Sequence, residues 1–398
     1  MSKMLWKVAL VLAVAAPCVL ARVTGTSLDP LHAIFAFGAG VVAASFLLSW
    51  AAETAQVDIS ASFATALLAL IAVLPEYAVD LYFAFTAGHR PEYAAYAAAN
   101  MTGSNRLLIG IGWPLVVLVF AAGLRRRHEP RRGVVLRPRR RVELAFLATA
   151  GIYAFIIPLK GTLSLIDAVV LLALFGGYMW RASHQEKEEP ELHGVPAAIA
   201  KLPTAMRRST VIVFFVGAAA IIALAAKPFA DGLVEGGRHL GIDEFLLVQW
   251  LAPLSSEAPE LIVAAMLAMR GDDENALGVL LSSKVNQWTL LVGSLPIAHA
   301  LGGGGFLLPL DSRQNEEFLL TAAQAVFALS VVLALRLRMR DALLLFVTFA
   351  AQFFFPQQGA RLVFAAVYGA LAALIIALRY KQIIPTMRAL VRNDDPHR

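Results

Sequence analysis

Two glutamates, each directly after a proline, lie in long apolar stretches of the 398-residue chain. Glu76 follows Pro75 in LLALIAVLPEYAVDLYFAF, and Glu260 follows Pro259 in VQWLAPLSSEAPELIVAAMLAM. A carboxylate at bilayer depth costs about 2.5–3.5 kcal/mol on insertion scales. A chain that accepts this cost at two matching places is expected to use both carboxylates, and hard cations are the ligands that such oxygen donors suit. The pair therefore predicts a cation site.

Each proline also changes the oxygen atoms near its glutamate. Proline has no N–H, so the carbonyl four residues earlier loses its helical hydrogen bond. These carbonyls belong to Ile71 and Ser255. Free carbonyls beside a carboxylate give an oxygen-rich site suited to a hard cation. A plain proline kink, with the glutamate in an internal ion pair, is the alternative interpretation.

Composition places these residues in a membrane protein. Hydrophobic residues make up 59% of the chain and charged residues 16%, which is too apolar for an ordinary soluble protein. The apolar runs do not alternate as barrel strands do. The single Cys18 excludes an intrachain disulfide and a multi-cysteine metal cluster. The net charge of +6 comes from arginines in loops, which indicates a lipid bilayer as partner and no nucleic acid.

About twelve transmembrane helices are predicted, because apolar runs of about 17–25 residues recur and each can cross a bilayer. The predicted spans are 5–21, 31–52, 59–87, 91–121, 142–158, 163–182, 209–232, 244–270, 274–300, 316–335, 341–355 and 360–379. The first run could also be a cleaved signal peptide. No small-residue cleavage site precedes a polar start there, which favours a retained helix.

Positive charge predicts the orientation of these helices. Nine arginines lie between Arg125 and Arg141, and further basic loops cover 201–208, 336–340 and 379–398. Placing all of these loops in the cytoplasm agrees with alternating spans and puts both termini inside. We therefore expect a multi-pass protein of the cell's inner (plasma) membrane with cytoplasmic N- and C-termini.

The surroundings of the two glutamates form an internal repeat. Residues 48–83 and 226–265 both contain a polar helix end, a small acidic loop, a long apolar helix and Pro-Glu. Each copy is followed by a Gly/Ser/Asn-rich helix, AAANMTGSNRLLIGIG or ALGVLLSSKVNQWTLLVG. Under the predicted topology the copies cross the bilayer in opposite directions, as in many secondary transporters.

The repeat divides the chain into five parts. The first and second inverted repeats cover 31–182 and 209–355, and 183–208 is a cytoplasmic linker between them. Residues 1–30 form an extra transmembrane helix, and 356–398 form another one with a basic cytoplasmic tail. The predicted fold is an all-α polytopic membrane protein, with two inverted five-helix repeats plus one extra helix at each end.

At these motifs the chain resembles the cation/calcium exchanger superfamily, the sodium/calcium exchangers and their relatives, as a divergent member. Those proteins have two inverted repeats, each with G-T-S-x-P-[ED] on one helix and G-N-x-x-G-S-N-x-x-[ND] on the next. The resemblance covers about residues 31–355. The cation ligands that it implies are Glu76, Glu260, Ser104, Ser283, Asn100 and Asn105.

The hydroxyl ligands of the Pro-Glu motif differ between the repeats. Ala72 and Val73 replace them in the first repeat, so hydroxyl oxygens are lost there. Ser256 and Glu257 stand at these positions in the second repeat. Ser256 keeps a hydroxyl oxygen, and Glu257 adds a carboxylate one turn from Glu260. We therefore include Ser256 and Glu257 among the predicted cation ligands.

The second motif has changed as well. The polar residue four positions after the motif serine is Leu108 in the first repeat and Gln287, a further predicted ligand, in the second. Lys284 replaces the asparagine after the second serine, and Arg106 adds a cation near the first motif. A site that has lost neutral oxygens and gained a fixed ammonium is not expected to hold three sodium ions.

Lys284 suggests a coupling mechanism. Charge balance at bilayer depth favours pairing its ammonium with Glu257 or Glu260. We hypothesise that Lys284 takes the space of a coordinated cation and that a carboxylate or the lysine carries the proton. The alternatives are that Lys284 extends to the surface or only locks helix packing.

Besides Lys284, two more polar residues, Asp80 and Asn286, are expected to modulate transport. Asp80 lies one turn beyond Glu76 and would line the outer vestibule, or else lie at the headgroup level. Asn286 and Asn100 are expected to be pore or interhelical hydrogen-bonding residues.

The predicted function is secondary active antiport of the sodium/calcium exchanger type. Ca²⁺ or another cation would be exchanged for Na⁺ or H⁺ by alternating access around Glu76 and Glu260. Inorganic cations are then its ligands, and no cofactor is expected. A sodium/proton antiporter without calcium transport is the alternative. An intramembrane hydrolase using Glu257 and Glu260 lacks a nucleophile and a metal-ligand set, so we do not expect an enzyme. The sequence leaves the oligomeric state open and is compatible with a monomer.

Overall fold

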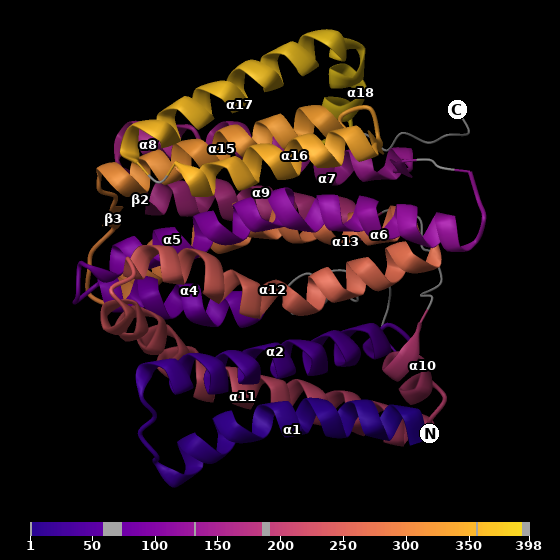
Figure 1. Ribbon diagram of the computed structural model, residues 1–398, viewed down its shortest axis with the longest axis vertical. Coiled ribbons are helices and arrows are strands. Elements are labelled where there is room, and N and C mark those ends of the chain that lie inside the picture. Colours follow the sequence, from indigo (N-terminus) through magenta and orange to yellow (C-terminus); the bar gives the residue numbers. More distant parts are fainter. Residues whose placement is uncertain (1, 59–73, 131–132, 185–191, 356, 392–398) are drawn as a thin grey trace. The chain divides into compact units, whose positions relative to one another are not determined.

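The helices group into two units, each built from both halves of the sequence (Figure 1). Unit 1 contains residues 1–83 and 182–259, and unit 2 contains 84–181 and 260–398. Two helices continue from one unit into the other, α4 (Leu74–Ala87) after Phe83 and α12 (Glu244–Arg270) between Pro259 and Glu260. The described parts of the computed structural model are residues 2–58, 74–130, 133–184, 192–355 and 357–391.

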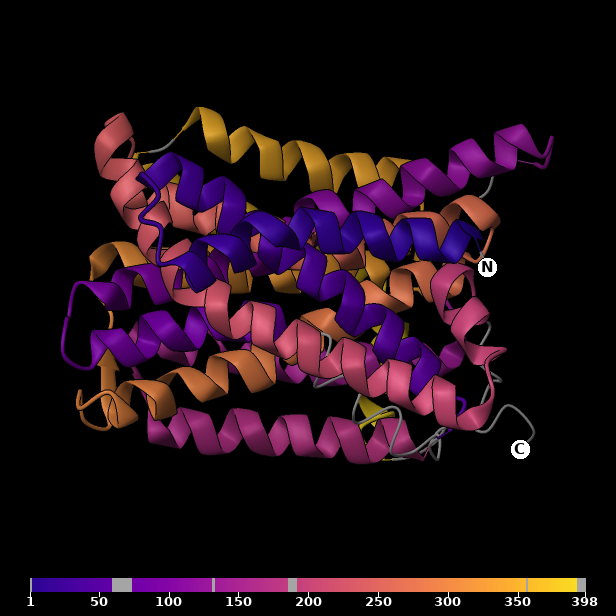
Figure 2. The same cartoon turned by 90° about the horizontal axis from the view of Figure 1, so that it is seen from below.

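Unit 1 is a layer of long helices with one short helix beside them. Its elements, besides its parts of α4 and α12, are α1 (Ser2–Thr24), α2 (Pro30–Ala55), α10 (Gly194–Ala200) and α11 (Thr204–Leu240). α1, α2 and α11 run side by side in both views (Figures 1 and 2). Gly38 on α2 allows a close approach of α11. A Cβ at this position would lie 2.9 Å from the ring of Phe229 on α11, so a larger residue would push the helices apart.

Unit 2 carries the remaining helices, most of which run parallel or antiparallel to one another (Figures 1 and 2). In the first half they are α5 (Tyr93–Leu107), η1 (Leu108–Gly112), α6 (Trp113–Arg126), η2 (Pro138–Arg140), α7 (Arg141–Tyr153), α8 (Ile156–Lys160) and α9 (Leu165–Ser183). In the second half they are α13 (Asp273–Asn286), η3 (Gln287–Leu291), α14 (Val292–Leu301), α15 (Ser312–Val332), α16 (Met339–Ala351), η4 (Gln352–Phe354), α17 (Gln358–Leu378), η5 (Tyr380–Gln382) and α18 (Ile383–Arg388).

Local sequence explains where several of these helices begin and end. Asp29 caps α2 by accepting hydrogen bonds from two backbone N–H groups, and Pro30 starts the helix. Asp311 and Gln314 form a capping box at the start of α15. Gly241, with φ of 65°, ends α11 in the left-handed conformation that glycine adopts easily.

Two short strand pairs tie the loops of unit 2 together. β1 (Val134–Val135) pairs antiparallel with β4 (Arg336–Leu337), and β2 (Thr162–Ser164) pairs antiparallel with β3 (Leu307–Pro309). β4 follows the end of α15 and β3 precedes its start, so the pairs lie at opposite ends of that helix. The β1–β4 pair joins two loops that are predicted to be cytoplasmic, and the β2–β3 pair joins two that are predicted to be external. Which end faces the cytoplasm stays a prediction.

Every predicted span contains a helix in the described residues, with α12 covering 244–270 as predicted. The first part of the predicted span 59–87 lies outside the described residues, and α4 covers the rest. Among the described residues, 8 helical stretches are long and apolar enough to cross a membrane. The chain is therefore a multi-pass membrane protein, while the count of twelve crossings stays a prediction.

The core of unit 2 forms around α15, which packs against α5, α7, α8 and α17. A glycine permits a further close contact, between η1 and α16. A Cβ at Gly110 would lie 2.1 Å from Cγ of Phe349, so any side chain at this position would overlap the ring. This contact fixes α16 beside the first Gly/Ser/Asn-rich helix.

Candidate cation-binding site

The two Gly/Ser/Asn-rich motifs lie on α5 and α13, and each helix leads into a π-helical segment. η1 begins at Leu108, four residues after Ser104, and η3 begins at Gln287, four residues after Ser283. A π segment inserts an extra residue into a helical turn, and such segments frequently occur at functional sites. η3 packs against α5, and η1 packs against α13. The two motifs therefore share a local geometry and contact each other reciprocally.

The two motif-bearing helices run antiparallel within unit 2. After α6 ends, Arg127 donates from Nη1 to the carbonyl oxygen of Met269, shortly before α13, at 3.0 Å. At the opposite end, Gly88 lies before α5 and Gly302 after α14, so close that a Cβ at Gly88 would be 2.4 Å from the Gly302 carbonyl carbon. These opposite directions agree with the predicted inversion, which for the complete repeats stays a prediction.

Lys284 is enclosed between the two motifs. Its Nζ donates to Oδ1 of Asn105 at 2.7 Å and also to the main-chain oxygen of Asn105. The ring of Trp288 lies 5.8 Å from Nζ, within cation–π range. Asn105 in turn donates from Nδ2 to the Met101 oxygen at 2.9 Å, which turns Oδ1 toward the ammonium. Because Asn105 and Lys284 each follow a motif serine, this hydrogen bond joins the repeats at corresponding positions.

The burial of Lys284 rules out the alternative that its side chain extends to the surface. The side chain is 0% exposed, so it does not extend to the surface. Its pairing with Glu257 or Glu260 stays a prediction. The contact with Asn105 is one that the sequence did not indicate, because the asparagine lies on a helix of the other repeat.

Two polar side chains of α5 provide buried oxygens beside this contact. Asn100 and Ser104 are 1% and 0% exposed and lie one turn apart on the same face of the helix. Within the described residues, neither the Asn100 amide nor the Ser104 hydroxyl has a hydrogen-bond partner. Buried polar groups are nearly always hydrogen-bonded, so these oxygens are available to an ion or a water molecule. Ser283, at the matching position on α13, is also buried.

The predicted acidic ligands lie on α4 and α12. Glu76 is 4% exposed and Glu257 is 2% exposed, whereas Glu260 is partly buried. Asp80, one turn after Glu76, is completely buried, and its role in a vestibule stays a prediction. The described residues contain no group of three or more His, Cys, Asp and Glu side chains placed to hold a metal ion.

The structure describes the residues next to Glu260 but not those just before Pro75. The Ser256 hydroxyl donates to the Ala252 oxygen at 3.2 Å, which leaves its lone pairs free to face a cation. α12 continues as a helix through Pro259. Ile71, Ala72 and Val73 lie outside the described residues. Asn286 and Gln287 are completely or almost completely buried at the junction of α13 and η3.

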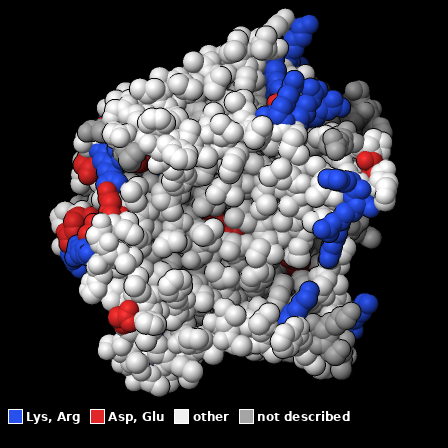
Figure 3. Space-filling model, in the orientation of Figure 1, with Lys and Arg blue, Asp and Glu red and all other residues white. Residues whose placement is uncertain are grey.

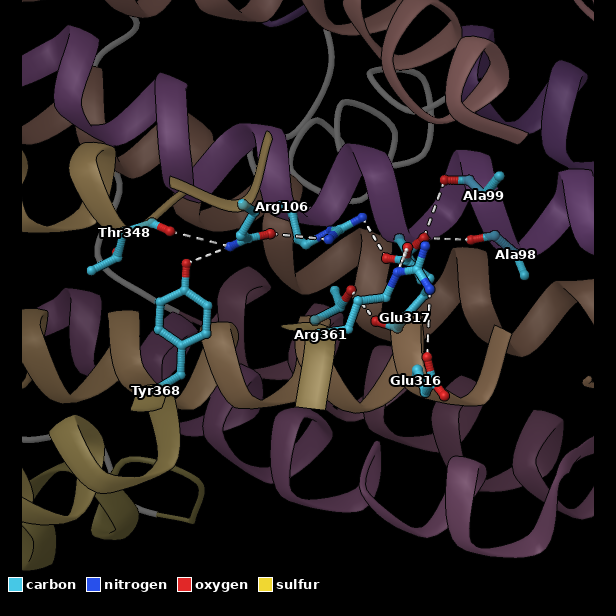
Figure 4. Close-up of polar contacts among 11 residues, drawn as sticks. Ala98, Ala99, Arg106, Glu316, Glu317, Thr348, Arg361 and Tyr368 are labelled. Atoms are coloured by element: carbon cyan, nitrogen blue, oxygen red, sulfur yellow. Dashed lines mark hydrogen bonds and ion pairs between the residues drawn. The ribbon is translucent and has the colours of Figure 1, made fainter. Parts of the chain in front are cut away.

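Arg106 belongs to a buried charge network that sequence reasoning missed (Figure 4). Its Nη2 lies 2.6 Å from Oε2 of Glu317 on α15, and both side chains are 3% exposed. Arg361 on α17 approaches the same carboxylate, Nε to Oε1, at 2.9 Å and that of Glu316 at 3.5 Å. Two guanidiniums thus face two carboxylates, so Arg106 adds no net charge to the site. The sequence signal was the Glu316-Glu317 pair at the start of a predicted span.

A neutral chain extends this network to the end of α16. Arg106 donates from Nη1 to Oε1 of Gln352 at 3.1 Å, and Gln352 donates from Nε2 to the Tyr368 hydroxyl at 2.6 Å (Figure 4). Tyr368 is 0% exposed and stacks on Phe327. The network therefore connects the first motif helix with α15, α16 and α17.

Comparison with known proteins assigns the family. The family model described as sodium/calcium exchanger protein matches residues 30–183 and 210–356. The chain belongs to the sodium/calcium exchanger protein family. The resemblance predicted from the Pro-Glu and Gly/Ser/Asn motifs is thereby confirmed. The chain is accordingly a membrane-embedded cation exchanger, and its family is one of transporters rather than enzymes.

Solved structures give the same assignment. The H⁺/Ca²⁺ exchanger CAX is 43% identical, with a TM-score of 0.93 over 98% of both chains. Native YfkE is 13% identical, with a TM-score of 0.61 over 91% of this chain and 99% of its own. The sodium-calcium exchanger NCX_Mj is 17% identical, with a TM-score of 0.52 over 81% and 99%. The last two likenesses concern the fold alone. Among curated protein sequences we found no match.

Proposed function

We propose that this exchanger moves Ca²⁺ in one direction and H⁺ in the other by alternating access, with Glu76 and Glu260 as central cation ligands. The observation that carries the proposal is the ammonium of Lys284, buried against Asn105 between the two motif helices. The 43% identity to the structure described as an H⁺/Ca²⁺ exchanger supports the same choice of ions.

A buried ammonium disfavours a site for several sodium ions. Two unit charges 4 Å apart repel by about 4 kcal/mol at an effective dielectric constant of 20. An asparagine at position 284 would offer an oxygen to a cation, whereas the lysine adds a positive charge and uses Asn105 as its acceptor. Each sodium ion added to such a site meets this repulsion, while proton binding to a carboxylate removes a charge and places no ion there.

Charge balance suggests how Ca²⁺ and H⁺ would compete. The predicted acidic ligands Glu76, Glu257 and Glu260 carry three negative charges when ionised, and Lys284 carries one positive charge. The net charge of −2 would be neutralised by one Ca²⁺ or by two protons. Ca²⁺ prefers carboxylate, amide and carbonyl oxygens, and the buried Asn100 and Ser104 oxygens on α5 are of this kind.

The test is ion flux in proteoliposomes under one imposed gradient at a time. A pH gradient is expected to drive Ca²⁺ accumulation, and a Na⁺ gradient is expected to have no effect. Ca²⁺ movement driven by Na⁺ but not by H⁺ would contradict the proposal. Na⁺/H⁺ exchange without Ca²⁺ movement would establish the sodium/proton alternative.

The glutamates are tested in the same assay. Glu76→Gln and Glu260→Gln are each expected to reduce Ca²⁺ flux at least a hundredfold, because an amide supplies neither the negative charge nor the proton carrier. Glu235→Gln is the matched control, since Glu235 is an exposed glutamate on α11, and its flux should equal that of the natural protein. Normal flux in both site variants would remove Glu76 and Glu260 from the mechanism.

A further inference from the structure

Four arginines line one cavity at the end of unit 2 where β1 pairs with β4. The cavity has a volume of about 420 Å³. Its charged lining consists of Arg336, Arg338, Arg340, Arg379 and Asp341. Four guanidiniums against one carboxylate leave a net charge of +3 at the cavity wall. Such a concentration of one charge in a concave site attracts anions more strongly than the same arginines spread over a surface.

Two of the four guanidiniums already have partners within the fold. Arg379 donates from Nη1 to the main-chain oxygen of Ser330 at 3.2 Å and to that of Val331, where α15 ends. Nε of Arg340 lies 3.6 Å from Oδ1 of Asp341, and this carboxylate also accepts the backbone N–H of Arg338 at 3.0 Å. These contacts hold the cavity wall in place.

The other two guanidiniums, those of Arg336 and Arg338, remain for a ligand. Among the described residues, no carboxylate forms an ion pair with either of them. Arg336 lies on β4, whose backbone is fixed by pairing with β1. Arg338 lies directly before α16, a helix of 13 residues. The N-terminus of that helix carries a partial positive charge, which adds to the attraction for an anion.

The surface beside the cavity indicates where the anion comes from. α16 and α17 expose large apolar side chains along their lengths, including Leu343, Phe346, Val347, Leu374 and Leu378. Figure 3 shows Lys and Arg gathered at the end of α17, next to an area of the surface drawn in white. Tyr380, just beyond α17, is 60% exposed, as expected of an aromatic residue at the membrane interface. We therefore expect the cavity to lie at the level of the lipid headgroups.

We propose that this cavity binds the phosphate group of an anionic phospholipid, whose acyl chains lie along α16 and α17. The forked guanidiniums of Arg336 and Arg338 bind the phosphate oxygens. Basic pockets between transmembrane helices on the cytoplasmic side take such headgroups, and the loop charges predict that this end is cytoplasmic. A zwitterionic headgroup carries its own cation, which the net charge of +3 repels.

The test measures lipid binding to the purified full chain by native mass spectrometry. Delipidated protein is titrated with phosphatidylglycerol, with phosphatidylcholine and with inorganic phosphate. Arg336→Gln/Arg338→Gln is expected to bind phosphatidylglycerol about tenfold or more weakly, since each arginine near an anionic surface contributes about 1 kcal/mol. The control is Arg125→Gln/Lys201→Gln, which removes two charges from exposed basic residues outside the cavity. It should retain the affinity of the natural protein.

The single variants Arg336→Gln and Arg338→Gln are titrated as well, so the test does not depend on the folding of the double variant. An equal loss in the cavity and control variants would mean diffuse attraction by the basic loops and would overturn the proposal. Equal binding of phosphatidylcholine and phosphatidylglycerol would also overturn it. Inorganic phosphate bound as tightly as the lipid, and lost in the cavity variant, would assign the site to a soluble anion instead.

Discussion

At Lys284 an ammonium lies where the corresponding residue of the first repeat, Asn105, has an amide. The Lys284 ammonium donates to the Asn105 amide oxygen, so the two residues that differ between the repeats contact each other directly. A buried ammonium is costly unless its hydrogen bonds are made. Two oxygens of Asn105 and the Trp288 ring meet part of that need. The other cation added near the motifs, Arg106, is balanced by Glu317.

Replacing Lys284 tests whether its charge sets the ion coupling. Lys284→Asn is expected to increase by about one the number of monovalent cations moved per Ca²⁺, because a positive charge is lost and an amide oxygen is gained. Lys284→Met removes the charge without adding an oxygen, so it separates the two effects. The measurement is the number of monovalent cations moved per Ca²⁺, from parallel records of both fluxes in proteoliposomes at several pH values. Lys201→Asn, an exposed lysine in the linker, is the control. Unchanged stoichiometry and pH dependence in both Lys284 variants would show that Lys284 is structural.

At the scale of helices, glycine contacts set the approach of α16 to the first motif helix. Gly110 lies in η1 with the ring of Phe349 directly against it. The same helix α16 leads to Gln352, which accepts from Arg106. Displacing α16 would therefore disturb both the π segment and the charge network.

Gly110→Ala is expected to destabilise the protein by about 1–3 kcal/mol, because the new methyl group overlaps a packed ring. The matched control is Gly176→Ala on α9, where a Cβ has no heavy atom within 4 Å. That substitution should be neutral or stabilising, since alanine favours a helix over glycine by about 1 kcal/mol. Thermal unfolding in detergent measures both. A similar melting temperature for the two variants would contradict the close contact.

The helices were predictable because long apolar runs identify membrane spans. The edges of α2 and α12 fall within three residues of the prediction. The π segments were not predictable, because η1 (LIGIG) and η3 (QWTLL) are buried on nearly all sides, so hydrophobic periodicity gives no helical phase there. Strands of two or three residues, such as β1 and β4, give too little pattern to detect.

The candidate site was predictable only as a set of residue types. Pro75-Glu76 and Pro259-Glu260 identified the family, because the motif is local in sequence. The contacts of Lys284 and Arg106 were not predictable, since their partners Asn105 and Glu317 are 179 and 211 residues away in the chain. Which helix faces which is decided by packing of the complete chain, and no short motif encodes it.

At the scale of the whole molecule, each unit combines both halves of the chain. In unit 1 this connection includes an ion pair at the ends of α2 and α11. Asp58, just after α2, accepts from Arg207 Nε at 2.7 Å and Nη2 at 2.8 Å, and from Arg208 Nε at 3.2 Å. The hydrogen bonds from Arg207, the largest cause, lower the pKa of Asp58 to about 2.

This pair makes the stability of unit 1 depend on pH. A carboxyl group whose pKa is lower in the folded state stabilises above its unfolded pKa, about 3.9, and loses that contribution as pH falls toward 2. Asp58→Asn is therefore expected to lower the melting temperature by a few degrees at pH 7, with the difference shrinking below about pH 4. Thermal unfolding of both proteins between pH 7 and pH 3 measures this. A difference that stays constant over this range would mean that the ion pair is not its source.

The π segments determine where a change of chain length is tolerated. An α-helix turns about 100° per residue, and the wider turn of a π segment takes up one extra residue. Deleting one residue within η1, for example Ile109, would therefore restore a regular helix and leave the same face of α6 toward α13. A deletion in the regular part of α6 would instead rotate the residues beyond it by about 100°. The same holds for η3 and α14. In an alignment of these two helices a one-residue gap therefore belongs inside the π segment, where the faces on either side stay matched.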